Sequence, residues 1–260
     1  MTENIWSLES DDGPLVAAAI HDGHDVRAEV GELLAISESG RLREEDPFTS
    51  RWTAVAPTRI TGLKSRFEVD LNRPREKAVY VEPEDAWGLT VWRETPPDGL
   101  VERSLEEYDR FYAAMRDLFT TMVKRFGRLV VLDLHSYNHR RDGADSPSAD
   151  PRANPQVNVG TGSMDRDLWA PVVDRFIAGL AAYDFPGGCL DVRENVKFTG
   201  GHFSRWIHGE FPGKICALAV EFKKFFMDEW TGQPDETLVA AIGGALSSVV
   251  PGILEELDRL

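Results

Sequence analysis

The stretch LVVLDLHSYNHRRDG, residues 129–143, changes from apolar to polar near its middle. Its first part, LVVLDL at 129–134, is a short apolar run of the kind that forms a strand buried on both faces. The part that follows contains His135, Tyr137, His139 and two arginines. A buried strand that ends in so many polar groups predicts a sheet with a ligand site at one edge.

The segment before this strand has the pattern of an amphipathic helix. In SLEEYDRFYAAMRDLFTTMVKRFG, residues 104–127, apolar residues follow the 3.6-residue period. Ser104 and Glu107 match a capping box at the start, and Gly127 supplies a stop at the end. A helix that leads directly into a buried strand is typical of a βαβ crossover.

The rest of the chain continues this alternation. LVAAAI (15–20) and ICALAV (215–220) are further apolar runs of strand length, and helical patterns cover 164–183 and 234–257. Pro251 is predicted to kink or split the last helix. No linker or internal repeat interrupts residues 1–260. The fold class is therefore α/β, a single domain with a mixed, mostly parallel sheet and helices on both faces.

Composition limits the partners of the protein. The chain has 44 Asp plus Glu against 29 Lys plus Arg, a formal charge of −15. This charge repels polyanions, so we expect no nucleic acid as a partner. An anionic small molecule would need a local cluster of arginines.

The sequence also bears on location and on the thiols. No apolar run approaches the roughly 18 residues of a membrane span, and the N-terminus lacks the pattern of a signal peptide. We therefore expect a cytoplasmic protein that does not interact with membranes. Cys189 and Cys216 lie in apolar surroundings without CxxC spacing, which predicts buried thiols rather than a disulfide.

Polar side chains follow each of the three apolar runs. His21 and His24 follow the first, His135 the second and Glu221 the third. A catalytic zinc ion takes three protein ligands and keeps its fourth position for water. A nearby carboxylate can accept a proton from that water. The pattern predicts a zinc site with three histidine ligands and Glu221 as the base, although Glu221 in an ion pair with a neighbouring lysine is the simpler alternative.

The segment SRFEVDLNRPREKAVY, residues 65–80, alternates polar and apolar residues. At strand spacing, Arg66, Asp70 and Asn72 would share one face, with Arg73 next to them. Arginine binds carboxylates through two parallel hydrogen bonds, so this segment is a candidate for holding an anionic substrate. The alternative is a solvated edge strand in which Asp70 pairs with an arginine.

Several motifs together resemble those of the N-formylglutamate amidohydrolase family. They are HDG (21–23), SRFEVDLNRP (65–74), LDLHS (132–136), NVGTG (158–162) and GGHFSRW with ALAVEFKKFFMDE (200–229). The DLNR and DLH pieces are also similar to those of aspartoacylases and zinc carboxypeptidases. The resemblance implies a zinc-dependent deacylase with a zinc-carboxypeptidase-like (phosphorylase/hydrolase-like) fold and one zinc ion per chain.

The resemblance also implies roles for individual residues. The implied metal ligands are His21 and His135, the general base is Glu221, the positive group that faces the carbonyl oxygen is Arg66, and the groups that hold a substrate carboxylate are Asn72 and Arg73. In the wider group the first ligand begins an HxxE motif, whereas this chain has His24 in the place of the glutamate. Either His24 completes the metal site, or Glu45 or Asp46 does so.

Other residues are expected at the edges of the site. The glycine pair in TGGHFSRW, residues 199–206, predicts a loop from which His202 and Arg205 contact the substrate, unless the segment is a solvated turn. Asp133 is expected to bond the imidazole of His135 and fix its tautomer. Trp87 and Trp92, in EDAWGLTVWRE (84–94), have no assigned role and would shape the pocket.

These observations predict a hydrolase that cleaves the amide bond of an N-acyl amino acid, such as N-formylglutamate, with metal-activated water. One alternative is a deacylase or small carboxypeptidase with the same chemistry and a different N-acyl amino acid or peptide substrate. Another is a metal-binding protein on this scaffold without turnover.

Overall fold

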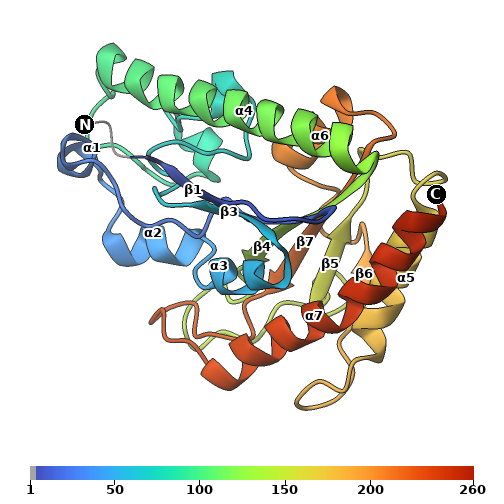
Figure 1. The fold of residues 1–260 in the computed structure, drawn as a ribbon. Helices are drawn as coiled ribbons and strands as arrows, with labels where there is room; N and C mark the ends of the chain where they lie inside the picture. Colours follow the sequence, from blue (N-terminus) through green and yellow to red (C-terminus); the bar gives the residue numbers. More distant parts are fainter. Residues whose placement is uncertain (1–3) are drawn as a thin grey trace.

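The computed structural model describes residues 4–260, which form one α/β domain around a seven-stranded sheet (Figure 1). The order of the strands in the sheet is β1-β3-β2-β4-β7-β5-β6. Their bounds are β1 Trp6–Glu9, β2 Leu15–Ala19, β3 Thr58–Gly62, β4 Leu129–Tyr137, β5 Val157–Gly160, β6 Val192–Glu194 and β7 Ile215–Lys223. The β1·β3 and β5·β7 pairs are antiparallel and the other pairs are parallel. The predicted mixed, mostly parallel sheet is confirmed.

Helices cover both faces of this sheet, as predicted (Figure 1). They are α1 Ala28–Leu33, α2 Glu38–Glu44, α3 Thr49–Trp52, α4 Asp98–Phe126, α5 Ala170–Ala182, α6 His202–Glu210 and α7 Glu236–Arg259. Short 3-10 turns cover Thr53–Val55, Arg75–Lys77 and Pro83–Ala86. The apolar sides of α4 and α6 pack on one face of the sheet, and those of α5 and α7 pack on the other.

The alternation of side chains along β4 explains this arrangement. Val130, Leu132 and Leu134 join the core under α5 and α7, whereas Leu129 and Val131 join the core under α4 and α6. All nine residues of β4 are buried. The apolar run is continuous because successive side chains enter two different cores.

Two predicted helix starts were wrong. Helix α4 begins at Asp98, not at Ser104, and Ser104 lies fully buried within it. Its hydroxyl accepts a hydrogen bond of 2.6 Å from the guanidinium of Arg27, so it does not cap the helix. The apolar face extends back to Leu100, which is buried, and this packing places the start six residues earlier. Helix α5 begins at Ala170, later than the predicted residue 164.

Helix α7 runs through Pro251 without a break. Pro251 is exposed, while Val249 and Ile253 on either side of it are buried in the core. Packing of the apolar face therefore outweighs the local effect of the proline. By length and hydropathy α7 would suffice to cross a membrane, but core helices meet the same criteria, and α7 packs against α5 and the sheet.

The predicted polar strand at 65–80 does not form. The segment consists of turns and the 3-10 turn Arg75–Lys77. Phe67 and Val69 are buried as the alternation indicated, but Glu68 and Asp70 are fully buried as well. Glu68 and Asp70 have partners inside the protein, and only residues 75–77 are exposed, so the segment lacks the alternating solvent-facing side of an edge strand. The thiols also differ from expectation, since Cys216 is buried but Cys189 is exposed.

Candidate active site

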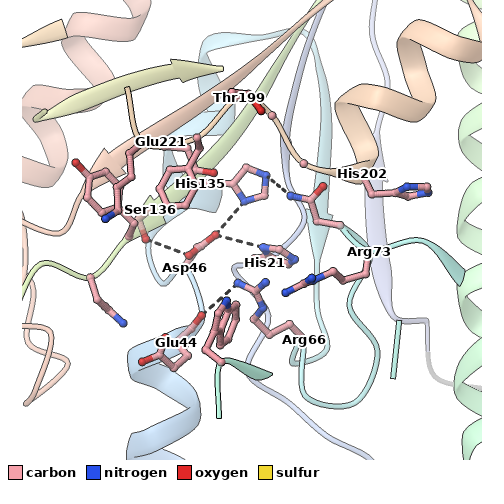
Figure 2. Close-up of a pocket in the computed structure, with 18 of the residues that line it drawn as sticks. His21, Glu44, Asp46, Arg66, Arg73, His135, Ser136, Thr199, His202 and Glu221 are labelled. Carbon is pink, nitrogen blue, oxygen red and sulfur yellow. Dashed lines mark hydrogen bonds and ion pairs between the residues drawn. The ribbon is translucent and has the colours of Figure 1, made fainter. Parts of the chain in front are cut away.

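The carboxyl ends of three neighbouring parallel strands bring the predicted residues together. His21 lies two residues beyond the end of β2, and His135 lies in β4 directly opposite Glu221 in β7. All three side chains line one pocket of about 600 Å³ (Figure 2). Ligand sites of α/β sheets form at this edge, so the strand pattern correctly predicted where these three residues meet.

The centre of the pocket is a buried group of His21, Asp46 and His135, called here the His-Asp-His group. Nδ1 of His135 lies 3.0 Å from Oδ2 of Asp46, and Nδ1 of His21 lies 3.4 Å from the same oxygen (Figure 2). One candidate ligand atom from each residue lies within 4.8 Å of the others. The group has the donor types and the spacing to hold a metal ion.

A carboxylate lies behind each imidazole. His21 contacts Asp70 through Nε2 at 2.6 Å, and His135 contacts Asp133 through Nε2 at 2.9 Å. A carboxylate that accepts a hydrogen bond from Nε2–H leaves the lone pair of Nδ1 free for a metal, which is the usual arrangement around a metal-binding histidine. The contact expected between Asp133 and His135 is confirmed.

The buried charges also fit a cation. Asp46, Asp70 and Asp133 are at most 2% exposed, and among the residues described Oδ2 of Asp133 has no hydrogen-bond partner. Arg66 neutralises Asp70 at 2.8 Å. Buried carboxylates need a positive partner, so the remaining two favour either protonated histidines or a divalent cation between the imidazoles.

The electrostatics of Asp46 and Glu221 differ. Burial opposes ionisation of Asp46, but hydrogen bonds from His135 and His21 outweigh it and hold the pKa of Asp46 well below its usual range. Burial raises the pKa of Glu221 to about 7. Neither Lys223 nor Lys224 forms an ion pair with Glu221 in the part of the chain described here. Glu221 therefore has the pKa of a general base that works near neutral pH.

His24 does not join the group, and Asp46 occupies the place that the sequence analysis gave to His24. Nδ1 of His24 contacts Glu45, and Nε2 lies 3.5 Å from Glu38. Glu45 also accepts a hydrogen bond from Ser65, on the side away from the pocket. Glu45 has extended backbone angles, so it and Asp46 point to opposite sides of the chain, and only Asp46 can face the histidines.

The SRFEVDLNRP segment, residues 65–74, contributes four pocket residues, of which Pro74 is apolar. Arg66, Asn72 and Arg73 all line the cavity, as the resemblance implied. Arg66 is anchored by Asp70 and also donates to the hydroxyl of Tyr80 at 3.1 Å. The amide of Asn72 lies 3.4 Å from Nε2 of His135. Arg73 lies 4.0 Å from Asp70 and is more exposed than Arg66, so it is the more available of the two arginines to a ligand.

His202 and Arg205 also line the pocket, but both lie in helix α6 rather than in a loop. Only residues 199–201 form the expected loop, because α6 begins at His202. A Cβ atom on Gly201 would lie 2.2 Å from the amide of Asn72, which explains the need for glycine there. The close approach lets the backbone N–H of Phe203 bond Oδ1 of Asn72 at 2.9 Å.

The sequence analysis missed several pocket residues. Glu44, Arg141, Lys197 and Lys224 line the cavity without an assigned role, whereas Trp87 lines it as expected. These four side chains come from the last residue of α2, from connecting segments or from beyond a strand end, where no periodicity marks them as pocket residues. The arginines and lysines of the pocket form a positive site within a chain of net charge −15, as an anionic ligand would require.

The α/β sheet, with its His-Asp-His group and an acid of raised pKa at the carboxyl edge, has the features of an amidohydrolase. The chain belongs to the N-formylglutamate amidohydrolase family, whose model matches residues 13–227, so the resemblance of the motifs is confirmed. No curated protein matches the chain.

Solved structures show the same fold. The crystal structure of N-formylglutamate amidohydrolase from Ralstonia eutropha superposes with a TM-score of 0.76 at 19% identity and covers 98% of each chain. A gene product of Agrobacterium tumefaciens gives a TM-score of 0.67 at 16% identity, covering 98% of this chain and 97% of the other. At these identities the similarity establishes the shared fold alone.

Proposed function

We propose that the protein hydrolyses the amide bond of an N-acyl amino acid, with N-formylglutamate as the first candidate substrate. The observation that carries the proposal is the buried His-Asp-His group next to Glu221 in a pocket lined by cations. Membership of the amidohydrolase family supports the same reaction class. A relation to zinc carboxypeptidases and a cytoplasmic location stay predictions from the sequence.

We assign His21, Asp46 and His135 as the ligands of one zinc ion. When bound, zinc polarises a carbonyl group and lowers the pKa of water toward neutrality. Asp70 and Asp133 hold the two imidazoles in the orientation that the ligands need. His24 is not part of this assignment.

The other pocket side chains have separate roles around the amide bond. Glu221 accepts a proton from the attacking water and delivers it to the departing amine. Arg66 places its charge near the oxygen that becomes negative during attack. Asn72 and Arg73 orient the substrate through its carboxylate, and the charge of the remaining pocket favours small anionic substrates over nucleic acids.

The size of the pocket supports a second candidate within the same chemistry. A cavity of about 600 Å³ lies in the range of sites for drug-sized ligands, which is more than N-formylglutamate needs. Trp87 is 48% exposed at this pocket and offers an aromatic surface. Both observations favour an N-acyl amino acid or dipeptide with a larger acyl group.

Two measurements test the proposal. Elemental analysis of the purified protein should find about one zinc ion per wild-type chain and little in His135→Ala. The zinc-loaded protein should then hydrolyse members of a panel of N-formyl, N-acetyl and larger N-acyl amino acids. Zinc binding without hydrolysis of any member would favour a binding protein on this scaffold. Absence of zinc from the wild type, even after incubation with the ion, would contradict the metal assignment.

A further inference from the structure

Lys197 is a pocket cation without an acidic partner. Among residues 4–260 no carboxylate lies within ion-pair distance of its ammonium group, whereas Arg66 pairs with Asp70 and Arg141 with Glu44. Nζ of Lys197 donates a hydrogen bond of 2.6 Å to Oδ1 of Asn154. Neutral groups therefore hold this lysine, and no carboxylate of the described residues pairs with it directly.

Two aromatic rings complete the surroundings of this ammonium group. Nζ lies 5.2 Å from the centre of the Tyr137 ring and 5.6 Å from that of Phe198. Aromatic faces stabilise a cation and leave it free to accept an anion from the open side. Lys197 and Phe198 both line the cavity.

The backbone of Lys197 is fixed beside the proposed base. Asn158 in β5 lies directly opposite Glu221 in β7. Its Oδ1 accepts hydrogen bonds from the backbone N–H groups of Val196 at 3.0 Å and Lys197 at 2.8 Å. Its amide donates to the carbonyl of Phe198 at 2.8 Å. These bonds from one fully buried side chain hold the segment in register with Glu221.

Lys197 and Arg73 lie at opposite ends of the pocket. Arg73 lies on the far side of the His-Asp-His group from Glu221 (Figure 2). Lys197 lies on the Glu221 side, because Asn158, which is opposite Glu221 in the sheet, bonds its backbone. Burial and the charge of Arg141 lower the pKa of Lys197, whereas Glu221 raises it. A substrate bound over the metal site thus has a positive group at each end.

We propose that Lys197 binds a second carboxylate of the substrate, so that the enzyme selects N-acyl amino acids that carry two carboxylates. The inference rests on the proposed function, in which Asn72 and Arg73 hold the first carboxylate. The second belongs either to the amino-acid side chain or to the acyl group, and both sources present the same anion to the lysine. Arg141 adds positive charge next to this position.

The test compares substrates that differ by one charge. For wild type and Lys197→Met, kcat/KM is measured with N-formylglutamate and N-formylglutamine, and with N-succinylglutamine and N-butyrylglutamine. In one pair, the preference for the substrate with the second carboxylate should fall roughly ten- to a hundredfold in the variant. The change should appear mainly in KM, because a charge-assisted hydrogen bond is lost. The pair that responds identifies the source of the carboxylate. An unchanged preference in both pairs would overturn the proposal.

Two controls separate charge from structure. Lys214→Met removes a lysine next to the opposite end of β7 and should leave both preferences as in wild type. Lys197→Arg keeps the charge and should keep most of the preference. Met preserves the length of the side chain against Tyr137 and Phe198, and thermal unfolding checks that each variant folds.

Failure of the proposed function is distinguishable from failure of this inference. If the zinc-loaded wild type hydrolyses neither these four substrates nor any member of the wider panel, the proposed function is wrong, but calorimetry still tests the binding position. Glutarate should then bind wild type more tightly than butyrate, and Lys197→Met should bind the two alike. Equal affinities of wild type for glutarate and butyrate would overturn the inference.

Discussion

The pocket has two walls that the chain builds in different ways. The strand wall consists of His21, His135 and Glu221, which follow or lie in β2, β4 and β7. The loop wall includes Asp46 and Lys197, which come from connecting segments. Backbone pairing between strands fixes the first wall, so its geometry follows from register. The second wall depends on side chains that bond distant backbone groups.

Lys224 shows how the two walls are joined. It follows β7, and its ammonium group donates to the backbone carbonyls of Arg43 at 2.6 Å and Glu45 at 2.7 Å. These carbonyls belong to the segment that leads from α2 into Asp46. Burial lowers the pKa of Lys224 to about 8, yet its contacts still favour the charged form that donates. Lys224, which follows β7, thus helps to fix the position of Asp46 in the loop wall.

The strongest test of the two-wall description removes a ligand from the loop wall. Asp46→Ala should lower the zinc content from about one ion per chain to near zero and abolish hydrolysis, because only two imidazoles remain. His24→Ala should keep both zinc and activity, since His24 contacts Glu45 instead. Elemental analysis of both variants gives the answer. Zinc retained in Asp46→Ala and lost in His24→Ala would restore the three-histidine site.

A second variant tests the strand wall without disturbing the metal. Glu221→Gln should lower kcat about 10²–10⁴-fold with zinc still bound, because the amide cannot accept the proton of the attacking water. Steady-state kinetics and elemental analysis are measured on the same preparation. Glu210→Gln, in an exposed ion pair with Arg116, is the matched control and should turn over as wild type does. Full turnover by Glu221→Gln would remove the assignment as the base.

The strand wall was predictable because local patterns decide it. The runs at 129–134 and 215–220 have too many apolar residues in succession for an exposed strand, and polar residues at their carboxyl ends must then meet at one edge. His135 and Glu221 followed from this argument alone. The 3.6-residue period also predicted the long helix α4. Its start was not predicted, because the packing of Leu100 extends the helix beyond the apparent capping box at Ser104.

The loop wall was not predictable, because its geometry depends on contacts that are distant in sequence. Glu45 and Asp46 are adjacent acids, and the contacts of Glu45 with Ser65 and His24 decide which of the two faces the pocket. The alternation at 65–80 correctly marked the buried apolar residues, but neighbouring strands were absent and it formed turns. Lys197 has no local signal, since Asn158 in another strand fixes its position.

The carboxylates behind the imidazoles provide a test of intermediate size. Asp133→Asn and Asp70→Asn should each weaken zinc binding about 10–100-fold, because the imidazole loses the carboxylate that orients it. Competition with a chelator measures the affinity. Asp70 also bonds Arg66, Tyr80 and the backbone of Asn72, so its substitution should lower the free energy of unfolding more than that of Asp133 does. Unchanged zinc affinity in both variants would show that the carboxylates do not support the metal site.

The smallest expected effect concerns the framework under the strand wall, away from the metal ligands. His208 in α6 accepts a hydrogen bond of 3.1 Å from the backbone N–H of Ala217 through Nε2, and Nδ1 lies 2.8 Å from the hydroxyl of Ser163. The contact with Ala217 requires a neutral ring, because Nε2 can accept only when it carries no proton, and burial lowers the pKa of His208 to about 4.

The unfolded chain binds a proton at His208 near its ordinary pKa of about 6.5, whereas the folded chain resists protonation until about pH 4. The contribution of the neutral ring to stability is therefore fully present above pH 6.5 and is lost as the pH falls toward 4. Between pH 7.5 and 5.0, wild type should lose about 2 kcal/mol more unfolding free energy than His208→Gln, which cannot titrate. Urea denaturation at the two pH values measures the difference. Equal losses would show that the imidazole is solvated enough to protonate in the folded protein, and that the strand framework does not depend on its neutral form.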